Sequence, residues 1–219
     1  MAVVISSTVV ACKKADLSSD KGKSSYAIGY GYGSFMKKQG VDIADLDMKS
    51  FKAAVEDALS GTESSLDQKQ TEEAMQGLMA TLQKRRMAGA AENQKKGDDF
   101  LAANKVKDGV KTTSTGLQYK VIKEGKGAKP KLTDMVTVHY AGKLIDGKEF
   151  DSSYKRNEPV KFKLNEVIKG WSEGLQLMTV GSKYELVIPA DLGYGPGGNQ
   201  VIPGNSVLVF EVELMGIGK

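Results

Sequence analysis

Residues 136–159 read VTVHYAGKLIDGKEFDSSYKRNEP, and this stretch holds the chain's only histidine, His139. Its first positions alternate in polarity, so Val136, Val138 and Tyr140 fall on one face of an extended segment while His139 falls on the other. Such alternation is typical of a strand with one buried face. The stretch therefore predicts a strand that buries Tyr140 and turns His139 toward solvent.

Histidine, aspartate and serine occur together in this stretch, which raises the question of a hydrolase triad. A serine nucleophile needs a strained, exposed turn such as G-x-S-x-G, together with donors for the oxyanion. Neither Ser152 nor Ser153 lies in such a motif. A single histidine is also a weak basis for a metal site. We therefore expect neither a catalytic triad built on His139 nor a bound metal ion.

Short segments on both sides of this stretch are rich in β-branched and aromatic residues and predict further strands. Together with the first strand, they cover residues 117–123, 135–143, 160–164, 183–189 and 207–214. Asp146-Gly147 is a tight-turn signal, and residues 168–177 fit one short amphipathic helix. Strands that follow one another without intervening helices imply an antiparallel sheet, and this helix is enough to cover its apolar face.

The first half of the chain has helical patterns instead. Helices are predicted over residues 24–40, 48–59 and 67–104. The first contains Gly29, Gly31 and Gly33, but these lack the preceding strand and the spacing of a phosphate-binding loop, so close helix packing is the better interpretation. The third would be a rod on the order of 55 Å long. Its second half is polar on most faces, which predicts a solvent-bridging spacer.

These helices contain too few residues for a stable core of their own. About 60 residues lie in the two short helices and the apolar part of the third, which would make a lone core marginal. Met75 and Met79 lie on the apolar stripe of the third helix, and methionine suits irregular contacts. We therefore expect a homodimer that forms through the N-terminal helices.

Composition and charge limit the possible functions. The chain has 219 residues, of which 40% are hydrophobic and 26% charged, and no apolar run reaches the roughly 20 residues of a membrane-spanning helix. The net charge of +4 comes from scattered lysines, without a basic cluster or an arginine-rich helix. Nucleic acid is therefore not an expected partner.

The single cysteine, Cys12, excludes an intrachain disulfide and a cysteine-based metal cluster. It follows Val9-Val10-Ala11, which resembles a bacterial lipobox at the end of an apolar stretch. No Lys or Arg precedes that stretch, and the segment is short for a signal peptide. We interpret it as part of a leader that directs export to the periplasm or outer membrane, with lipid attachment at Cys12. A cytoplasmic protein is the alternative.

Four motifs in the second half of the chain occur in a specific order. They read VHYAGKLIDGKEFDSS, NEVIKGWSEGLQLMTVGSKYELVIP, YGPGGNQVIP and LVFEVEL. In this order and spacing they resemble the FKBP family of peptidyl-prolyl cis-trans isomerases, over about residues 113–217. The helical pattern of residues 20–112 is similar to that of the Mip and FkpA-like bacterial subgroup.

The resemblance implies an α+β protein with four parts. These are a leader and flexible N-terminus (1–19), a helical dimerisation domain (20–66), a long connecting helix and linker (67–112), and the isomerase domain (113–219). The isomerase domain is expected to be a five-stranded antiparallel half-barrel around a short helix. It would present a shallow apolar pocket for the proline ring.

The resemblance also implies roles for individual residues. The catalytic residues would be Asp151, Tyr194, Phe150 and Tyr140, and the substrate- and macrolide-binding residues would be Trp171, Val167, Ile168, Phe210, Ile202, Arg156 and Val160. Trp171 would form the pocket floor. Asp151 would face the carbonyl of the rotating bond, and Arg156 would orient it. Tyr194 and the backbone N–H of Ile168 would bind carbonyl groups of the substrate.

Two features depart from the family pattern. Val160 stands where many members place an aromatic residue. The loop GPGGNQVIP is shorter than in many members, which removes a contact near Ile202. Both bear on affinity and on side-chain preference rather than on the activity itself.

The implied function is rotation of X-Pro bonds without a cofactor, by a dimeric catalyst and chaperone. Its partners would be proline-containing peptides and unfolded exported proteins, and rapamycin-type macrolides would inhibit it. The alternative is a chaperone or surface-interaction protein in which isomerase activity is incidental. The helical half favours that alternative, because isomerisation chemistry does not need it.

Overall fold

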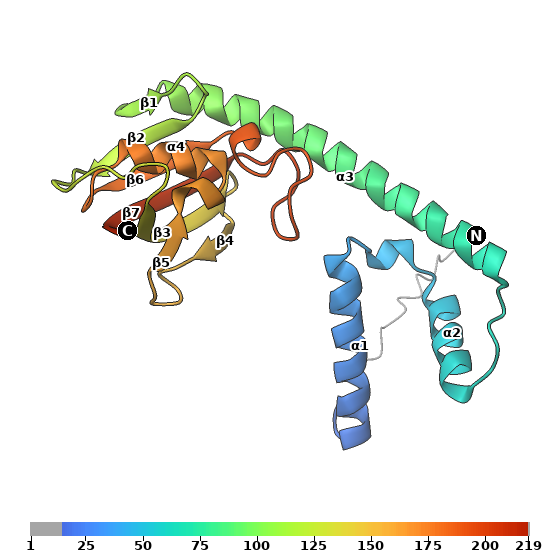
Figure 1. The fold of residues 1–219 in the computed structure, drawn as a ribbon. Helices are drawn as coiled ribbons and strands as arrows, with labels where there is room; N and C mark the ends of the chain where they lie inside the picture. The colour runs from blue at the N-terminus through green and yellow to red at the C-terminus, as the bar shows by residue number, and fades with distance from the viewer. Residues whose placement is uncertain (1–14, 219) are drawn as a thin grey trace, which may run out of the picture. The chain divides into compact units, whose positions relative to one another are not determined.

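The structure is a computed structural model, and it describes residues 15–218. Within them the chain forms two compact units, which divide between Leu78 and Met79. The first unit is helical and the second contains the sheet, as Figure 1 shows by colour along the chain. Cys12 and most of the expected leader lie outside the described residues.

The N-terminal unit begins with two short helices joined by a single turn. They are α1 (Asp20–Lys38), the 3-10 turn η1 (Ile43–Asp45) and α2 (Met48–Ser60). Ser19 caps α1 by accepting the N–H of Gly22, and Asp47 caps α2 by accepting the N–H of Ser50. Both predicted helices are confirmed. No residue of α1 or α2 is buried.

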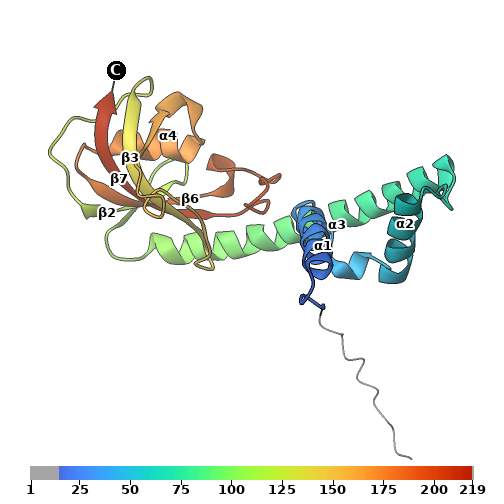
Figure 2. The same ribbon diagram turned by 90° about the horizontal axis from the view of Figure 1, so that it is seen from below.

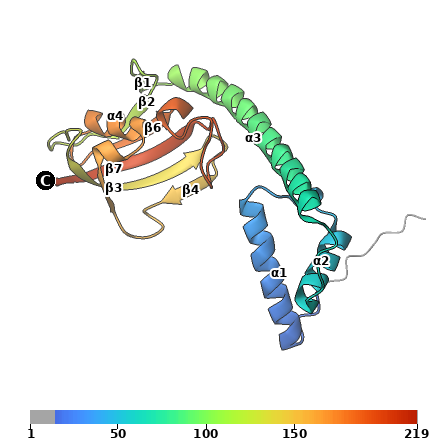
Figure 3. The same ribbon diagram turned by 45° about the vertical axis from the view of Figure 1, so that its right-hand side comes forward.

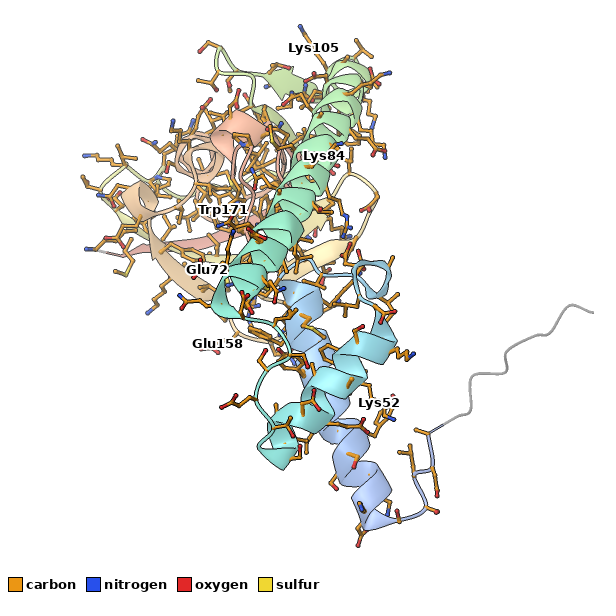
Figure 4. The ribbon with its side chains drawn as sticks, turned by 90° about the vertical axis from the view of Figure 1, so that its right-hand side faces the viewer. Lys52, Glu72, Lys84, Lys105, Glu158 and Trp171 are labelled. Carbon is orange, nitrogen blue, oxygen red and sulfur yellow. The ribbon has the colours of Figure 1, made fainter. Side chains whose placement is uncertain are left out.

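The third helix is α3 (Gln68–Lys105), a single helix of 38 residues as predicted. Figure 4 shows it uninterrupted from Glu72 through Lys84 to Lys105. The prediction that its second half bridges solvent is wrong, because Gly97 and Asn104 are buried. A buried glycine and a buried amide leave no apolar stripe in the sequence. The pattern of hydrophobic residues therefore could not indicate this contact.

The C-terminal unit contains one antiparallel sheet, shown in Figure 3. Its strands are β1 (Val110–Thr112), β2 (Gln118–Lys123), β3 (Met135–Leu144), β4 (Glu149–Ser152), β5 (Val160–Lys163), β6 (Lys183–Ile188) and β7 (Leu208–Gly218). The order across the sheet is β1-β2-β6-β7-β3-β4, and β5 also pairs with β3. The α+β class and the antiparallel sheet are confirmed.

The expected count of five strands is wrong, since the described residues form seven. The two additional strands are β1 and β4, which have three and four residues. Segments this short cannot show alternation over several positions, so the sequence pattern missed them. β4 follows the turn at Gly147 and carries Phe150 and Asp151, two of the predicted site residues, back along β3.

The core of this unit lies between the sheet and the helix α4 (Lys169–Leu177), which Figure 2 shows beside β3 and β7. Along β3, Val136, Val138 and Tyr140 are buried, as the alternation predicted. Gly174 allows α4 to approach β6 closely, because a Cβ atom there would lie 2.7 Å from the side chain of Leu186. Two 3-10 turns, η2 (Leu164–Glu166) and η3 (Ala190–Leu192), flank α4 and β6.

Candidate active site

Four aromatic side chains from four elements meet at one end of the core. The rings of Tyr140, Phe162 and Phe210 each present an edge-to-face contact to Trp171 in α4. The ring-centroid distances are 5.0, 5.4 and 5.3 Å, and the interplanar angles are 87°, 87° and 81°. This is a geometry that aromatic pairs prefer. We call these four residues the Trp171 cluster.

Trp171 also carries a polar group that the fold leaves unused. Its side chain is only 4% exposed, and its indole N–H has no hydrogen-bond partner within residues 15–218. Buried donors are normally paired, because an unpaired one loses its hydration without compensation. The indole N–H is therefore an exception to this rule among the described residues.

The other predicted apolar site residues lie around this cluster. Phe150 contacts Phe210 edge to face, with centroids 5.5 Å apart. The remaining side chains that pack against the same core are Val160, Val167, Ile168 and Ile202. Tyr194 follows η3 and is 40% exposed, so it stands at the surface rather than in the core. The predicted apolar residues thus belong to, or pack against, the core that contains Trp171.

A polar group borders the cluster where β3 and β4 pair. The hydroxyl of Tyr140 donates a hydrogen bond to the carboxylate of Asp151. Arg156 donates to the other oxygen of that carboxylate from Nη1, and its Nη2 lies 3.3 Å from the Tyr140 hydroxyl. The guanidinium therefore contacts both partners, as its planar fork allows. Arg156 also lines a surface hollow together with Val160.

These contacts set the charge of the group. Burial raises the pKa of Asp151, but the hydrogen bonds from Tyr140 and Arg156 and the charge of Arg156 outweigh it, so the pKa lies below 3.8. Burial, followed by the bond to Asp151, raises the pKa of Tyr140 above 10.0. At neutral pH the site therefore holds an ionised carboxylate beside a protonated phenol.

His139 lies on the opposite face of β3 from Tyr140 and takes no part in this group. Its Nδ1 is 2.9 Å from the hydroxyl of Ser153, which is fully buried, and its ring stacks on Tyr154 with centroids 4.7 Å apart. Asp151 instead bonds to Tyr140 and Arg156. The arrangement lacks the Asp-His-Ser order of a triad, in which the aspartate orients the histidine.

Ser153 has a structural role that the sequence did not indicate. Its hydroxyl accepts the backbone N–H of Tyr140 at 2.8 Å, and its own N–H donates to the Tyr140 carbonyl at 2.9 Å. It thereby fixes β3 at the residue whose phenol bonds to Asp151.

Phe162 is the member of the Trp171 cluster that the sequence reasoning missed. A signal existed, because Val160, Phe162 and Leu164 share one face of a strand by their alternation.

No group of three or more His, Cys, Asp or Glu residues within the described range is placed to hold a metal ion. The site is an apolar surface that offers hydrogen bonds and one carboxylate, without an exposed nucleophile bonded to a base.

Comparisons with known proteins match both halves of the chain. Residues 126–215 match the family described as FKBP-type peptidyl-prolyl cis-trans isomerase. Residues 21–121 match the family described as the domain amino terminal to FKBP-type peptidyl-prolyl isomerase. The two matches together cover most of the sequence.

Individual relatives extend over nearly the whole chain. The FKBP-type peptidyl-prolyl cis-trans isomerase FkpA of Aeromonas hydrophila is 46% identical over 94% of this chain and 80% of its own length. The outer membrane protein MIP of Legionella longbeachae is 42% identical over 100% of this chain and 95% of its own length. The crystal structure of FkpA from Escherichia coli has a TM-score of 0.65 at 42% identity, and the match covers 91% of this chain and 97% of that one.

Proposed function

The chain belongs to the FKBP-type peptidyl-prolyl cis-trans isomerases, and we propose that it acts as a dimeric folding catalyst on proline-containing segments of exported proteins. The observation that carries this proposal is the Trp171 cluster, bordered by the Tyr140, Asp151 and Arg156 group. An apolar floor of this kind suits a proline ring, and the polar group at its edge suits the amide next to that ring.

The reaction needs no bond to be broken. Rotation about an X-Pro amide has a barrier of about 18–20 kcal/mol, because the planar amide is stabilised by resonance. The twisted amide loses resonance and with it much of the polarity of its carbonyl. A surface that excludes water and makes better contacts with the twisted form lowers the barrier. This accounts for an aromatic site without a nucleophile.

The proposed roles are those that the resemblance implies, and the position of each residue agrees with them. Trp171 supports the proline ring, and Phe150 and Phe210 form walls beside it. Asp151 faces the carbonyl carbon of the rotating bond, where its negative charge is held by Arg156. Tyr140 fixes the orientation of that carboxylate.

Two donors would hold the flanking peptide groups of the substrate. The backbone N–H of Ile168 lies at the start of α4, where N–H groups lack helical partners. The hydroxyl of Tyr194, a residue that is 40% exposed, is the second donor. Val167, Val160 and Ile202 complete the apolar rim, and Val160 in place of an aromatic residue leaves one side of that rim small.

Dimerisation through the N-terminal unit is supported by the surface of α1. Tyr26, Tyr30, Tyr32 and Phe35 are each at least 50% exposed. Tyr32 stacks on Phe51 of α2, whereas Tyr26 and Tyr30, both on α1, stack on each other. A helix with aromatic side chains this exposed is unusual in a monomer, and a second copy would cover them.

We further propose the division of the chain given by its sequence. Residues 20–66 form the dimerisation domain and 113–219 the catalytic domain, and residues 67–112 join them through α3, whose second half packs on the catalytic domain. We also propose export to the periplasm or outer membrane, with lipid on Cys12. The export agrees with the name of the Legionella relative, an outer membrane protein. No helix among residues 15–218 is long and apolar enough to span a membrane.

A chaperone with incidental isomerase activity is the second candidate function. The observation that favours it is again the exposed aromatic surface of α1, which could bind apolar segments of unfolded clients. Dimerisation and client binding make different demands on that surface. A dimer buries the aromatic residues, whereas a client site leaves them exposed in the free protein.

Trp171 makes the proposed site directly observable, because it is the only tryptophan of the chain. A rapamycin-type macrolide is expected to change the tryptophan fluorescence in a saturable way and to inhibit isomerisation of a short X-Pro-Phe peptide over the same concentration range. Inhibition without a change in fluorescence would place the activity away from Trp171.

A further inference from the structure

The loop of residues 193–207, between η3 and β7, is closed by its own hydrogen bonds. The N–H of Asn205 donates to the carbonyl of Gly195 at 2.9 Å, and the N–H of Asn199 donates to the carbonyl of Ile202 at 2.8 Å. The loop begins beside Tyr194 and places Ile202 in the core cluster that contains Trp171. We call it the Tyr194 loop. The base of the loop, where Gly195 bonds to Asn205, therefore sets the positions of Tyr194 and Ile202.

The second half of α3 holds that base from outside. Asn93 Nδ2 donates to the carbonyl of Gly204 at 3.0 Å, and Asn205 Nδ2 donates to the carbonyl of Ala90 at 3.3 Å. The two amides thus bond in opposite directions between the helix and the loop. Figure 1 shows the loop before β7 beside this part of α3. All of these residues lie within the C-terminal unit.

The approach of α3 to this loop depends on Gly97. A Cβ atom at this position would lie 2.8 Å from Cγ2 of Val207, closer than atoms pack without a shift. Val207 is itself only 3% exposed and leads directly into β7. In the middle of an otherwise polar helix, glycine costs helical stability. Its presence at a buried position is therefore explained by contact with the loop.

A separate contact holds the end of α3. Asn104 Nδ2 donates to Gln118 Oε1 at 2.9 Å, and Gln118 Nε2 donates to the carbonyl of Leu101 at 2.9 Å. These bonds reach β2 and not the Tyr194 loop. The helix would therefore remain attached to the sheet if its bonds to the loop were removed.

We propose that Asn93, Gly97 and Asn205 are positioning residues of the isomerase, which act through the Tyr194 loop on the substrate contacts of Tyr194 and Ile202. The inference rests on the proposed function, since it assigns those two residues to substrate binding. The Tyr140, Asp151 and Arg156 group lies on other elements. Loosening the loop should therefore weaken substrate binding and leave the chemical step nearly intact.

Two matched pairs of variants test this in the full-length protein. Gly97→Ala introduces a methyl group against Val207, whereas Gly89→Ala adds the same methyl group to α3 with nothing within 4 Å. The second test variant combines Asn93→Ala with Asn205→Gly, because Asn205 has a φ of 55° that glycine adopts without strain. Gln94→Ala is its control, since Gln94 is exposed and its side chain donates to Asp98 on the same helix.

Isomerisation of a short X-Pro-Phe peptide is measured to separate KM from kcat, and amide hydrogen exchange is measured for Asn199 and Asn205. We expect Gly97→Ala and the double variant to raise KM at least threefold, with kcat within twofold of wild type and faster exchange at both amides. Both controls should match wild type. A variant that merely lost folded protein would instead lower the apparent kcat at unchanged KM.

The possible failures are distinguishable. Faster exchange in the loop with an unchanged KM would overturn the positioning role, and so would unchanged exchange in both test variants. A wild-type protein without peptide isomerisation would refute the proposed function, whatever the exchange at the loop.

Discussion

The phenol of Tyr140 donates a hydrogen bond to the carboxylate of Asp151, although the two residues come from different strands. Arg156, in the segment after β4, contacts both of them. The bond exists because β4 returns along β3 after a tight turn at Gly147. A strand of four residues thus brings the carboxylate of Asp151 to the edge of the Trp171 cluster.

Replacing Arg156 with lysine should separate the effect of charge from the effect of geometry. Lysine keeps the positive charge but cannot bond to Asp151 and Tyr140 through one planar fork. We expect kcat/KM for a short peptide to fall by about threefold to tenfold, the effect of about one hydrogen bond. Arg156→Ala should reduce it at least as much. Activity of Arg156→Lys equal to wild type would mean that only the charge matters.

His139→Ala should leave peptide isomerisation within about threefold of wild type. The imidazole bonds to Ser153 and stacks on Tyr154, on the face of β3 away from the Trp171 cluster. Its loss removes one modest hydrogen bond and some packing, which affects stability more than catalysis. A loss of a hundredfold in kcat/KM, with the fold intact by circular dichroism, would restore histidine as a catalytic group.

The pKa of Asp151 predicts how stability depends on pH. Because this pKa lies below 3.8 in the folded protein, the carboxylate stabilises the native state above that pH, and the contribution is lost as pH falls through the folded pKa. Urea unfolding between about pH 2 and 5 should therefore show a shallower pH dependence for Asp151→Asn than for wild type. Parallel curves for the two proteins would contradict the assignment.

Charge introduced into the exposed aromatic surface of α1 should break the dimer. The double variant Tyr30→Glu with Phe35→Glu is expected to sediment as a monomer at micromolar concentration, where wild type sediments as a dimer. Its activity on a short peptide should not change, while its activity on a refolding protein should fall because avidity is lost. Gln83→Glu, an exposed polar site on α3, is the control for added charge.

If the wild-type protein sediments as a monomer, the proposed dimer is wrong. The α1 surface would then be better explained as a binding site for unfolded clients. In that case the same double variant should lose its ability to suppress aggregation without any change in mass.

Some of the site could be predicted from sequence because its residues lie in motifs of fixed spacing. Tyr140, Phe150 and Asp151 belong to one stretch, and Trp171 lies in another. Local alternation was also enough to place Tyr140 in the core and His139 opposite to it. What these residues contact across the sheet is a matter of strand pairing, which no single stretch specifies.

The contact between α3 and the Tyr194 loop could not be predicted from any single stretch of sequence either. Asn93 and Gly204 are 111 residues apart in the chain, and neither is apolar enough to mark a buried face. Gly97 even counts against a packed helix by its propensity. Only the folded chain shows that a polar helix is buried at two of its least hydrophobic positions.

The most direct test of the central claim is the rate at which the full-length protein interconverts the cis and trans forms of an X-Pro-Phe peptide, measured by NMR exchange spectroscopy without a coupled protease. We expect wild type to accelerate exchange well above the uncatalysed rate, and Asp151→Ala to reduce kcat/KM by about tenfold, or about 1.4 kcal/mol. Uncatalysed exchange with wild type, or full activity in Asp151→Ala, would contradict the account.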